Sequence, residues 1–374
     1  MSRWKAFFAG DVVLSDGAPF VEAGLAAHIR EHDLASCNFE APVVPAGAAR
    51  ARKVGSWLSQ PAAAAARVLE TGFNVIHLAN NHLYDFGEAG LEATLASFAS
   101  ATVLGAGRDP AAAGELRVRE VRGVRVGLFG YGEAEFGALV GIGPKRGGFA
   151  WVNHPAVDGR IEEARRSVDV LLVQVHAGVE EVRLPLPEWR ARFRRLVELG
   201  ADAVIAHHPH VPQGWEVHRG KPIFHSLGNF AFDPPAEVPL WNRGYAVSLE
   251  FEGASLLGYT LVPTERTAHG VAVCADPEYA RELAERCAAL QDERYEQRAD
   301  EQAIELWRSR YRRYYRDAAL GLTREGLPRA LGGHRGGRAG HARLMLLHNI
   351  QIESHRWTVQ RALTALVTST DPGV

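Results

Sequence analysis

The stretch Asn74–Gly87 reads NVIHLANNHLYDFG and shows how this chain is built. It opens with a short apolar run, Asn74–Leu78, which is typical of a buried strand. The loop that follows carries two amides, an imidazole and a carboxylate, namely Asn80, Asn81, His82 and Asp85. Ligands of α/β sheets bind beyond the carboxyl ends of the strands. The stretch therefore predicts an α/β fold with functional side chains placed where its strands end.

The alternation of short apolar runs with amphipathic stretches continues to about residue 265. Further strands are expected at Lys5–Leu14, Ala35–Pro42, Val124–Gly130, Val168–Val175, Ala203–Ala206, Pro222–Phe224 and Ala246–Phe251. Helices are expected between several of the strands, at Pro61–Thr71, Leu91–Ser100, Val157–Ser167 and Glu188–Leu199. Because such helices bury their apolar faces on the sheet, the pattern predicts a layered α/β core.

Polar, metal-competent residues also follow five other predicted strands. These segments are Gly10-Asp11, Asn38-Phe39-Glu40, His176–Glu180, His207–His210 and His225–Phe230. A single histidine after a strand is more often a hydrogen-bonded loop residue than a ligand. Six such segments at successive strand ends, however, indicate one shared metal or acid/base site.

The candidate ligands combine oxygen and nitrogen donors. The oxygen donors are Asp11, Glu40 and the amide of Asn81, and the nitrogen donors are His176, His208 and His210. In the run from His207 to His210, alternate residues can point into one site, so we assign His207 a supporting position. This mixture of donors suits a divalent Mn, Fe, Zn, Mg or Ca ion and leaves the identity of the metal open.

Composition excludes several classes of protein. The chain has 374 residues, of which 23% are charged and 47% hydrophobic, an ordinary globular balance. Lys and Arg number 42 against 44 Asp and Glu, so no excess of positive charge favours nucleic acid. Three cysteines without C-x-x-C spacing argue against a disulfide framework or a structural zinc site. No apolar run reaches the ~18–20 residues of a membrane span, and no signal peptide is recognisable. We therefore expect a cytoplasmic protein without a membrane anchor.

The composition changes after residue 275 to Arg, Glu, Ala, Leu and Tyr with helical periodicity. We expect a first domain over residues 1–265 and a helical extension over residues 275–374 that packs on it. The glycine- and arginine-rich stretch Gly332–Arg338 is interpreted as a loop within this extension.

Three polar residues of the helical extension, His348, Glu353 and His355, accompany an apolar stripe. We interpret them as helix-surface residues, because charged and polar side chains usually occupy the solvated face of an amphipathic helix. The alternative is that they cap the mouth of the active site.

In these motifs the chain resembles the bacterial capsule-synthesis family (CapA-like, poly-γ-glutamate synthesis), a branch of the calcineurin-like metallophosphoesterases. The matching segments occur in the family's order, as Gly10-Asp11, Asn38-Phe39-Glu40, Ala79–His82 with Asp85–Gly87, His176–Glu180, Gly200–Asp202 with His207–Val211, and Ser226–Phe230. The resemblance implies a four-layer αββα sandwich with metal held at the strand ends. It also implies that Asn81 binds metal, that His82 stays unligated and donates a proton, and that Asp85 orients His82.

The chain departs from the wider superfamily at two motifs. The first motif of the superfamily is Asp-x-His, whereas Asp11 is followed by Val12 and Val13. The second is Gly-Asp, whereas this chain offers Asn38 and Glu40. Because two metals clamp the attacking and leaving oxygens of hydrolysis, loss of ligands weakens that mechanism in particular. One metal beside several imidazoles and carboxylates can still run acid/base chemistry at a carbon acid.

We expect a metal-dependent enzyme, and three functions stay open. The first is epimerisation at a Cα of a peptide substrate, since CapA-like proteins without an anchor include enzymes that tailor peptides, such as lasso-peptide epimerases. One proton carrier would be His82 with Asp85, and the other an unligated member of His176, His208 and His210. The second function is a phosphoesterase, or a hydrolase of poly-γ-glutamate or capsule synthesis. The third is a non-catalytic, polymer-binding scaffold. The expected partner is a peptide or polyglutamate-type substrate.

Overall fold

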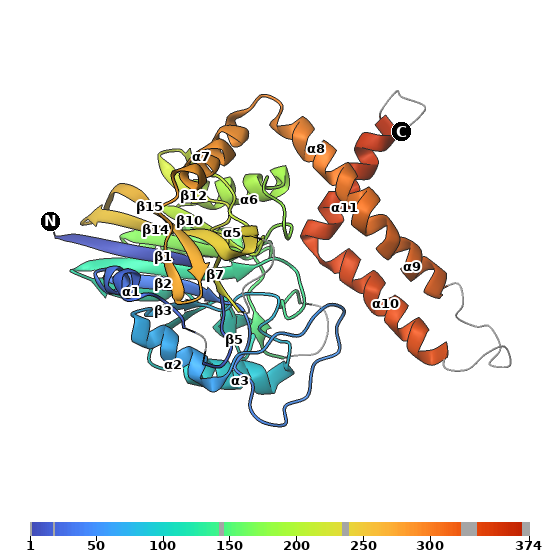
Figure 1. Cartoon of the computed structure of the whole chain (residues 1–374), viewed down its shortest axis with the longest axis horizontal. Helices are drawn as coiled ribbons and strands as arrows, with labels where there is room; N and C mark the ends of the chain where they lie inside the picture. The colour runs from blue at the N-terminus through green and yellow to red at the C-terminus, as the bar shows by residue number, and fades with distance from the viewer. Residues whose placement is uncertain (1, 18, 142–145, 234–238, 323–334, 369–374) are drawn as a thin grey trace.

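Two large β-sheets form the centre of the molecule, as a computed structural model of residues 2–17, 19–141, 146–233, 239–322 and 335–368 shows (Figure 1). The strands of the first sheet, in spatial order, are β16 (Gly270–Val273), β15 (Ser255–Thr267), β14 (Arg243–Glu252), β1 (Arg3–Val13), β2 (Leu34–Phe39), β3 (Val75–His77) and β4 (Thr102–Leu104), with β13 (Asn229–Phe232) paired to β1. Those of the second are β11 (Trp215–His218), β12 (Lys221–Phe224), β10 (Ala203–His207), β9 (Val170–His176), β7 (Val124–Gly132) and β6 (Arg117–Val121). A separate pair consists of β5 (Ala106–Gly107) and β8 (Gly148–Phe149).

Strand β1 shows why the two sheets stack. Successive side chains of a strand point to opposite faces. Phe7 accordingly lies in the core on the outer face of the first sheet, whereas Trp4 and Phe8 lie in the core between the sheets. The core between the sheets also contains Val126 of β7 and Leu172 of β9. The central strands are therefore buried on both faces, as their nearly continuous apolar sequences require.

Helices cover the outer faces of both sheets. In the first part of the chain they are α1 (Ala23–Arg30), α2 (Ala62–Thr71), α3 (Gly87–Ser97), α4 (Pro110–Ala113), α5 (Val157–Ser167) and α6 (Pro187–Glu198), with a 3₁₀ turn η1 (Pro239–Asn242). Side chains of α1, α2 and α3 pack in the outer core of the first sheet, and those of α5 and α6 pack on the second sheet. The layers therefore run helix, sheet, sheet, helix, which confirms the predicted four-layer αββα sandwich.

The expected elements agree with the observed ones in position more closely than in length. Each of the eight expected strands coincides with a strand of one of the two sheets, and Val157–Ser167 is α5. The helix expected at Leu91–Ser100 begins earlier, at Gly87. Strand β15 was not predicted, because its sequence contains a glycine and a proline and most of its residues are only partly buried or exposed. Long pairing with β14 holds it in the sheet.

The C-terminal helices are α7 (Pro277–Gln291), α8 (Tyr295–Leu306), the π-helical turn η2 (Trp307–Tyr311), α9 (Arg312–Leu322), α10 (Arg335–Gln351) and α11 (Glu353–Thr368). Helix α7 contributes Tyr279 and Leu283 to the core between the sheets. Helices α8 to α11 gather at one side of the sandwich, coloured orange to red in Figure 1. The division at residues 265 to 275 remains a proposal.

The glycine- and arginine-rich stretch differs from the expected loop over its second half. Residues 332–334 lie outside the described part of the chain, but α10 already begins at Arg335. Helix α10 packs along α9, and this tertiary contact outweighs the poor helix propensity of glycine. No helix within the described ranges is long and apolar enough to cross a lipid bilayer.

Candidate functional site

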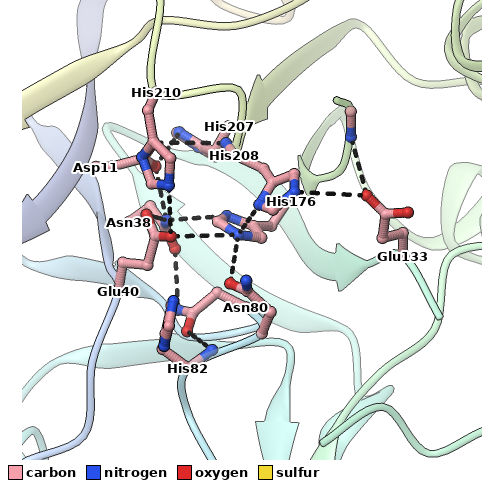
Figure 2. Close-up of polar contacts among 12 residues, drawn as sticks. Asp11, Asn38, Glu40, Asn80, His82, Glu133, His176, His207, His208 and His210 are labelled. Carbon is pink, nitrogen blue, oxygen red and sulfur yellow. Dashed lines mark hydrogen bonds and ion pairs between the residues drawn. The ribbon is translucent and has the colours of Figure 1, made fainter. Parts of the chain in front are cut away.

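The predicted site residues converge where strands of both sheets end (Figure 2). In the first sheet, β1 and β2 run parallel, and Asp11 stands opposite Asn38. In the second sheet, β9 runs parallel to β10, and His176 stands opposite His207. We call Asp11, Asn38, Glu40, His176, His208 and His210 the strand-end cluster. All six are at most 3% exposed, so these polar groups depend on one another for hydrogen bonds and charge balance.

A close approach of two backbones places Asp11. A Cβ atom at Gly10 would lie 1.9 Å from the carbonyl oxygen of Gly228, so only glycine fits there. This contact lets the backbone N–H of Asp11 donate to that oxygen at 3.1 Å. The next residue, Asn229, brings its Oδ1 to 3.0 Å from Nδ1 of His210. The predicted Ser226–Phe230 motif is therefore part of the site.

The run after β10 adopts an unusual backbone that turns its histidines in different directions. His208 has a φ of 101° and His210 a φ of 58°, values that favour glycine over residues with a side chain. Such conformations cost roughly 1–3 kcal/mol each and are found mainly at functional sites. His207 instead stacks on His77, with Nε2 at 3.4 Å from Oε1 of Gln174. Nδ1 of His207 lies 3.8 Å from Oδ1 of Asp11, and its supporting position stays a prediction.

Three overlapping sets of side chains offer ligand atoms within 4.8 Å of one another. They are Glu40 with His176 and His208, Asp11 with Glu40 and His210, and Glu180 with His208 and His210. Oε1 of Glu40 is buried, lies 3.5 Å from Nε2 of His210 and has no hydrogen-bond partner among the described residues. A buried carboxylate oxygen of this kind needs a positive partner, and the mixture of carboxylates and imidazoles is one that divalent cations bind. The arrangement therefore suits a divalent metal ion.

Asn81 and Asn38 have different places in this arrangement. Oδ1 of Asn81 lies 3.1 Å from Nε2 of His176, at the edge of the strand-end cluster, where it can serve as a further ligand. Asn38 lies inside the cluster, and its Nδ2 donates to Oδ1 of Asp11 at 2.7 Å and to Oε2 of Glu40 at 3.3 Å. Its amide hydrogens thus occupy a place between the two carboxylates. This organising role of Asn38 was not predicted.

His82 lies beside the strand-end cluster and is held by a carboxylate, as expected. Nδ1 of His82 lies 2.7 Å from Oδ2 of Asp85. Asp85 also forms an ion pair with Lys53 and accepts a hydrogen bond from the backbone N–H of Leu58 at 2.7 Å. Within the described part of the chain, His82 belongs to none of the three ligand sets. Burial lowers the pKa of His82, and the hydrogen bond with Asp85 opposes this change.

The histidines of the strand-end cluster have pKa values that are shifted in opposite directions. Burial lowers the pKa of His208 to about 4 and that of His176 well below its ordinary value. Burial would also lower the pKa of His210, but the facing carboxylates of Glu40 and Asp11 outweigh burial and raise it to about 10. His210 therefore holds a proton between two carboxylates, in a position that a cation could take over.

A pocket of about 240 Å³ opens next to the strand-end cluster. The sandwich contributes Asn81, His82 and Glu135 to its lining, and the C-terminal helices contribute His348 and His355. His348 and His355 therefore line the pocket and not a solvated helix surface, as the alternative interpretation held, whereas Glu353 is buried and is not among the lining residues. Helices α10 and α11 thus share this pocket with the loops after the strands. Helical periodicity in the sequence does not predict which element a helix will face.

Two further carboxylates of the site escaped prediction, although both follow β7. Burial and the neighbouring Glu180 raise the pKa of Glu135 to about 8. Glu133 places Oε1 at 3.8 Å from Nε2 of His208 (Figure 2). The rule that located the other segments, polar residues after a strand, applies here as well, but one carboxylate after a strand is a weak signal.

Comparison with known proteins finds similarity over the part of the chain that contains the strand-end cluster. The family model described as "Bacterial capsule synthesis protein PGA_cap" matches residues 5–234. The capsule biosynthesis protein CapA of Bacillus anthracis is 31% identical over 231 residues, which are 60% of this chain and 56% of that protein. The PGA biosynthesis protein CapA of Bacillus subtilis is 29% identical over 249 residues, 61% of this chain and 63% of that protein. The matches thus span little more than half the length of these curated relatives.

Solved structures resemble this chain at lower sequence identity. A putative 5'-nucleotidase from Staphylococcus aureus, in complex with alpha-ketoglutarate, is 15% identical, with a TM-score of 0.46 over 76% of this chain and 58% of that chain. The NAD nucleotidase of Haemophilus influenzae is 12% identical, with a TM-score of 0.40 over 76% of this chain and 55% of that chain. The match to the family model ends before α7, so the C-terminal helices lie outside it.

Proposed function

Because this chain belongs to the bacterial capsule synthesis protein PGA_cap family, we propose that it is a metal-dependent enzyme that epimerises a Cα of a peptide substrate. The observation that carries the proposal is a proton-transfer pair, His82 with Asp85, which lies outside the three ligand sets and of which His82 lines the pocket beside them. A phosphoesterase of the two-metal type depends mainly on ligands for two metal ions. An epimerase needs proton carriers next to one metal.

The residues that would hold the metal are Asp11, Glu40, His208 and His210, with His176 and Asn81 at their edge. Oε1 of Glu40, which faces Nε2 of His210 at 3.5 Å but has no hydrogen-bond partner among the described residues, supports this assignment. A divalent cation would supply Lewis acidity, stabilising negative charge on a carbonyl or carboxylate oxygen of the substrate.

His82 would move the proton at Nε2. Its Nδ1 faces Asp85, which fixes the ring and stabilises the charged form that exists while His82 carries a proton. Asp85 is in turn held by Lys53 and by the backbone N–H of Leu58, so the pair is rigid before substrate arrives. Rigid placement of this kind is what general acid/base catalysis requires.

Inversion at a carbon needs a second proton carrier on the opposite face. An imidazole of His176, His208 or His210 that the metal leaves unligated is one candidate. Glu135 is another, because it lines the pocket and its pKa of about 8 allows it to hold a proton at neutral pH. One carrier takes the proton from Cα as the other gives a proton to the opposite face, so the net charge of the site is unchanged.

Hydrolysis of a phosphoester or of a polyglutamate-type polymer is the second candidate. The observation that favours it is the sharing of Glu40, His208 and His210 among the ligand sets, which provides donors for two neighbouring ions. Two ions can clamp the attacking and leaving oxygens of a hydrolytic reaction.

One experiment separates the two candidates. The metal-loaded protein is incubated in D₂O with peptides that carry a free terminal carboxylate and, in parallel, with an aryl phosphate. Deuterium at a Cα, lost in His82→Gln while metal is retained, is the expected result. Phosphate release that Asn81→Ala abolishes, without exchange at any Cα, would show that hydrolysis is the activity.

A further inference from the structure

Glu133 lies between the strand-end cluster and the C-terminal helices. It follows β7 directly and is 1% exposed. Its Oε1 is 3.8 Å from Nε2 of His208 and accepts a hydrogen bond from the backbone N–H of Gly178 at 3.1 Å. A buried carboxylate in this place requires further donors, and most of them come from a distant part of the chain.

Those donors belong to Ser354, near the start of α11. The backbone N–H of Ser354 donates to Oε2 of Glu133 at 2.8 Å, and its hydroxyl donates to Oε1 at 2.9 Å. The same hydroxyl accepts a hydrogen bond from Nε1 of Trp189 in α6 at 2.8 Å. Ser354 therefore holds both oxygens of Glu133 and is itself held by the sandwich.

The neighbouring residue fixes α11 in place. The carboxylate of Glu353 accepts hydrogen bonds from the backbone N–H of Ala134 at 3.0 Å, from Nε1 of Trp151 at 2.9 Å and from Nδ2 of Asn153 at 2.9 Å. Glu353 is 2% exposed. Because Ala134 follows Glu133 in the chain, α11 contacts this short segment at two adjacent residues.

The two ring nitrogens of His208 face in different directions. Nδ1 lies 2.9 Å from Nε2 of His176, on the side of the ligand sets, whereas Nε2 is directed toward Glu133. A histidine that binds metal through one nitrogen usually faces a carboxylate or carbonyl with the other, and that partner sets the orientation of the ring. Glu133 is the carboxylate placed to do this for His208.

We propose that Ser354, acting through Glu133, positions His208 for metal binding, so that the start of α11 is an integral part of the metal site. Ser354 and Glu133 are positioning residues. The inference rests on the proposed function in one respect, namely that His208 is a metal ligand. It goes further because Ser354 lies outside the segment that matches the family model.

The test measures metal affinity with Mn²⁺ as the probe, by calorimetric titration of the full chain after chelation. Loss of a carboxylate or hydroxyl behind a metal ligand typically weakens metal binding by about 10- to 100-fold. We expect a loss in that range for Glu133→Gln and for Ser354→Ala. Ser354→Thr keeps the hydroxyl and should restore most of the affinity.

The matched control is Thr358→Ala. Thr358 is buried one turn further along α11, and its hydroxyl donates to the carbonyl oxygen of Ser354 at 2.6 Å, without a contact to Glu133 among the described hydrogen bonds. Its variant should melt at a lower temperature but bind Mn²⁺ as the wild type does. This control separates disturbance of the helix from loss of the contact to Glu133.

The outcomes are distinguishable from failure of the proposed function. A wild-type protein that binds no Mn²⁺ would contradict the metal site itself. A wild type that binds Mn²⁺, with Glu133→Gln and Ser354→Ala binding equally tightly, would overturn only the positioning role. If Ser354→Ala does not fold, Glu133→Gln decides, because it preserves the size of the side chain and an oxygen that can accept from Ser354.

Discussion

The strand ends of the sandwich and the C-terminal helices both contribute to one pocket, but in different chemical forms. The sandwich contributes Asn81 and His82 to the lining, next to the buried strand-end cluster of carboxylates and imidazoles. The helices contribute His348 and His355 at the pocket lining, and Glu353 and Ser354 as hydrogen-bonding groups behind it. The comparison suggests that the sandwich holds the reactive groups and the helices complete and support them. Four predictions test this division, from the largest expected effect to the smallest.

The largest effect is expected from Asp11→Asn. This change removes one negative charge from the strand-end cluster but keeps the shape of a side chain that contacts Asn38 and His210. We expect loss of stoichiometric metal, measured by elemental analysis, together with loss of activity to background.

The matched control for Asp11→Asn is Asp233→Asn. Asp233 is also a buried carboxylate that follows a strand next to β1, but it pairs with Arg266. Its variant should lose stability and keep metal. Full metal content in Asp11→Asn would remove Asp11 from the ligands and weaken the assignment of the whole cluster.

The second prediction concerns His82→Gln, which separates proton transfer from metal binding inside the sandwich. General acid/base groups contribute about 10²- to 10⁴-fold to a rate, so the turnover number should fall by that factor. Metal content should stay at the wild-type level, because His82 lies outside the ligand sets. A joint loss of metal and rate would reassign His82 to the metal.

The third prediction is a dependence of metal affinity on pH. The carboxylates of Glu40 and Asp11 raise the pKa of His210 to about 10, so this imidazole is protonated at neutral pH and a cation must displace the proton. Burial raises the pKa of Glu40 as well, and its protonation at low pH acts in the same direction. Affinity for Mn²⁺ should therefore rise about tenfold per pH unit between about pH 6.5 and pH 8.5.

The release of protons checks the same point. Titration calorimetry in two buffers with different ionisation enthalpies should show about one proton released for each ion bound. Affinity that is independent of pH, without proton release, would mean that the metal does not replace the proton on His210.

The two regions also differ in what their sequences reveal. Asp11, His176 and His210 could be predicted because each follows or ends an apolar run, and parallel strands bring such positions together. The positive φ values of His208 and His210 could not be predicted, because only the packing of this site stabilises a conformation that histidine rarely adopts. The family resemblance supplied the pairing of His82 with Asp85, and the geometry agrees with it.

The C-terminal helices were harder to interpret. Helical periodicity predicts which residues share a face of a helix, but not which other element covers that face. His355 and Ser354 belong to one helix, α11, yet one lines the pocket and the other contacts Glu133. Lys53 is a similar case, since it lies in a loop without a motif and reaches Asp85 only through the fold.

The smallest effect is expected from His355→Gln, and it tests whether the helices take part in the chemistry or only in binding. His355 belongs to the C-terminal helices and lines the pocket. Its Nδ1 is buried without a hydrogen-bond partner in the described chain. Burial lowers its pKa to about 3, so its imidazole is neutral and can donate or accept a single hydrogen bond to substrate. One such bond corresponds to about a 2- to 10-fold change in affinity. We therefore expect KM to rise by that factor with kcat nearly unchanged, whereas His82→Gln should lower kcat. If His355→Gln lowered kcat as strongly as His82→Gln, with metal content intact, the helices would supply a reactive group and the division between the two regions would fail.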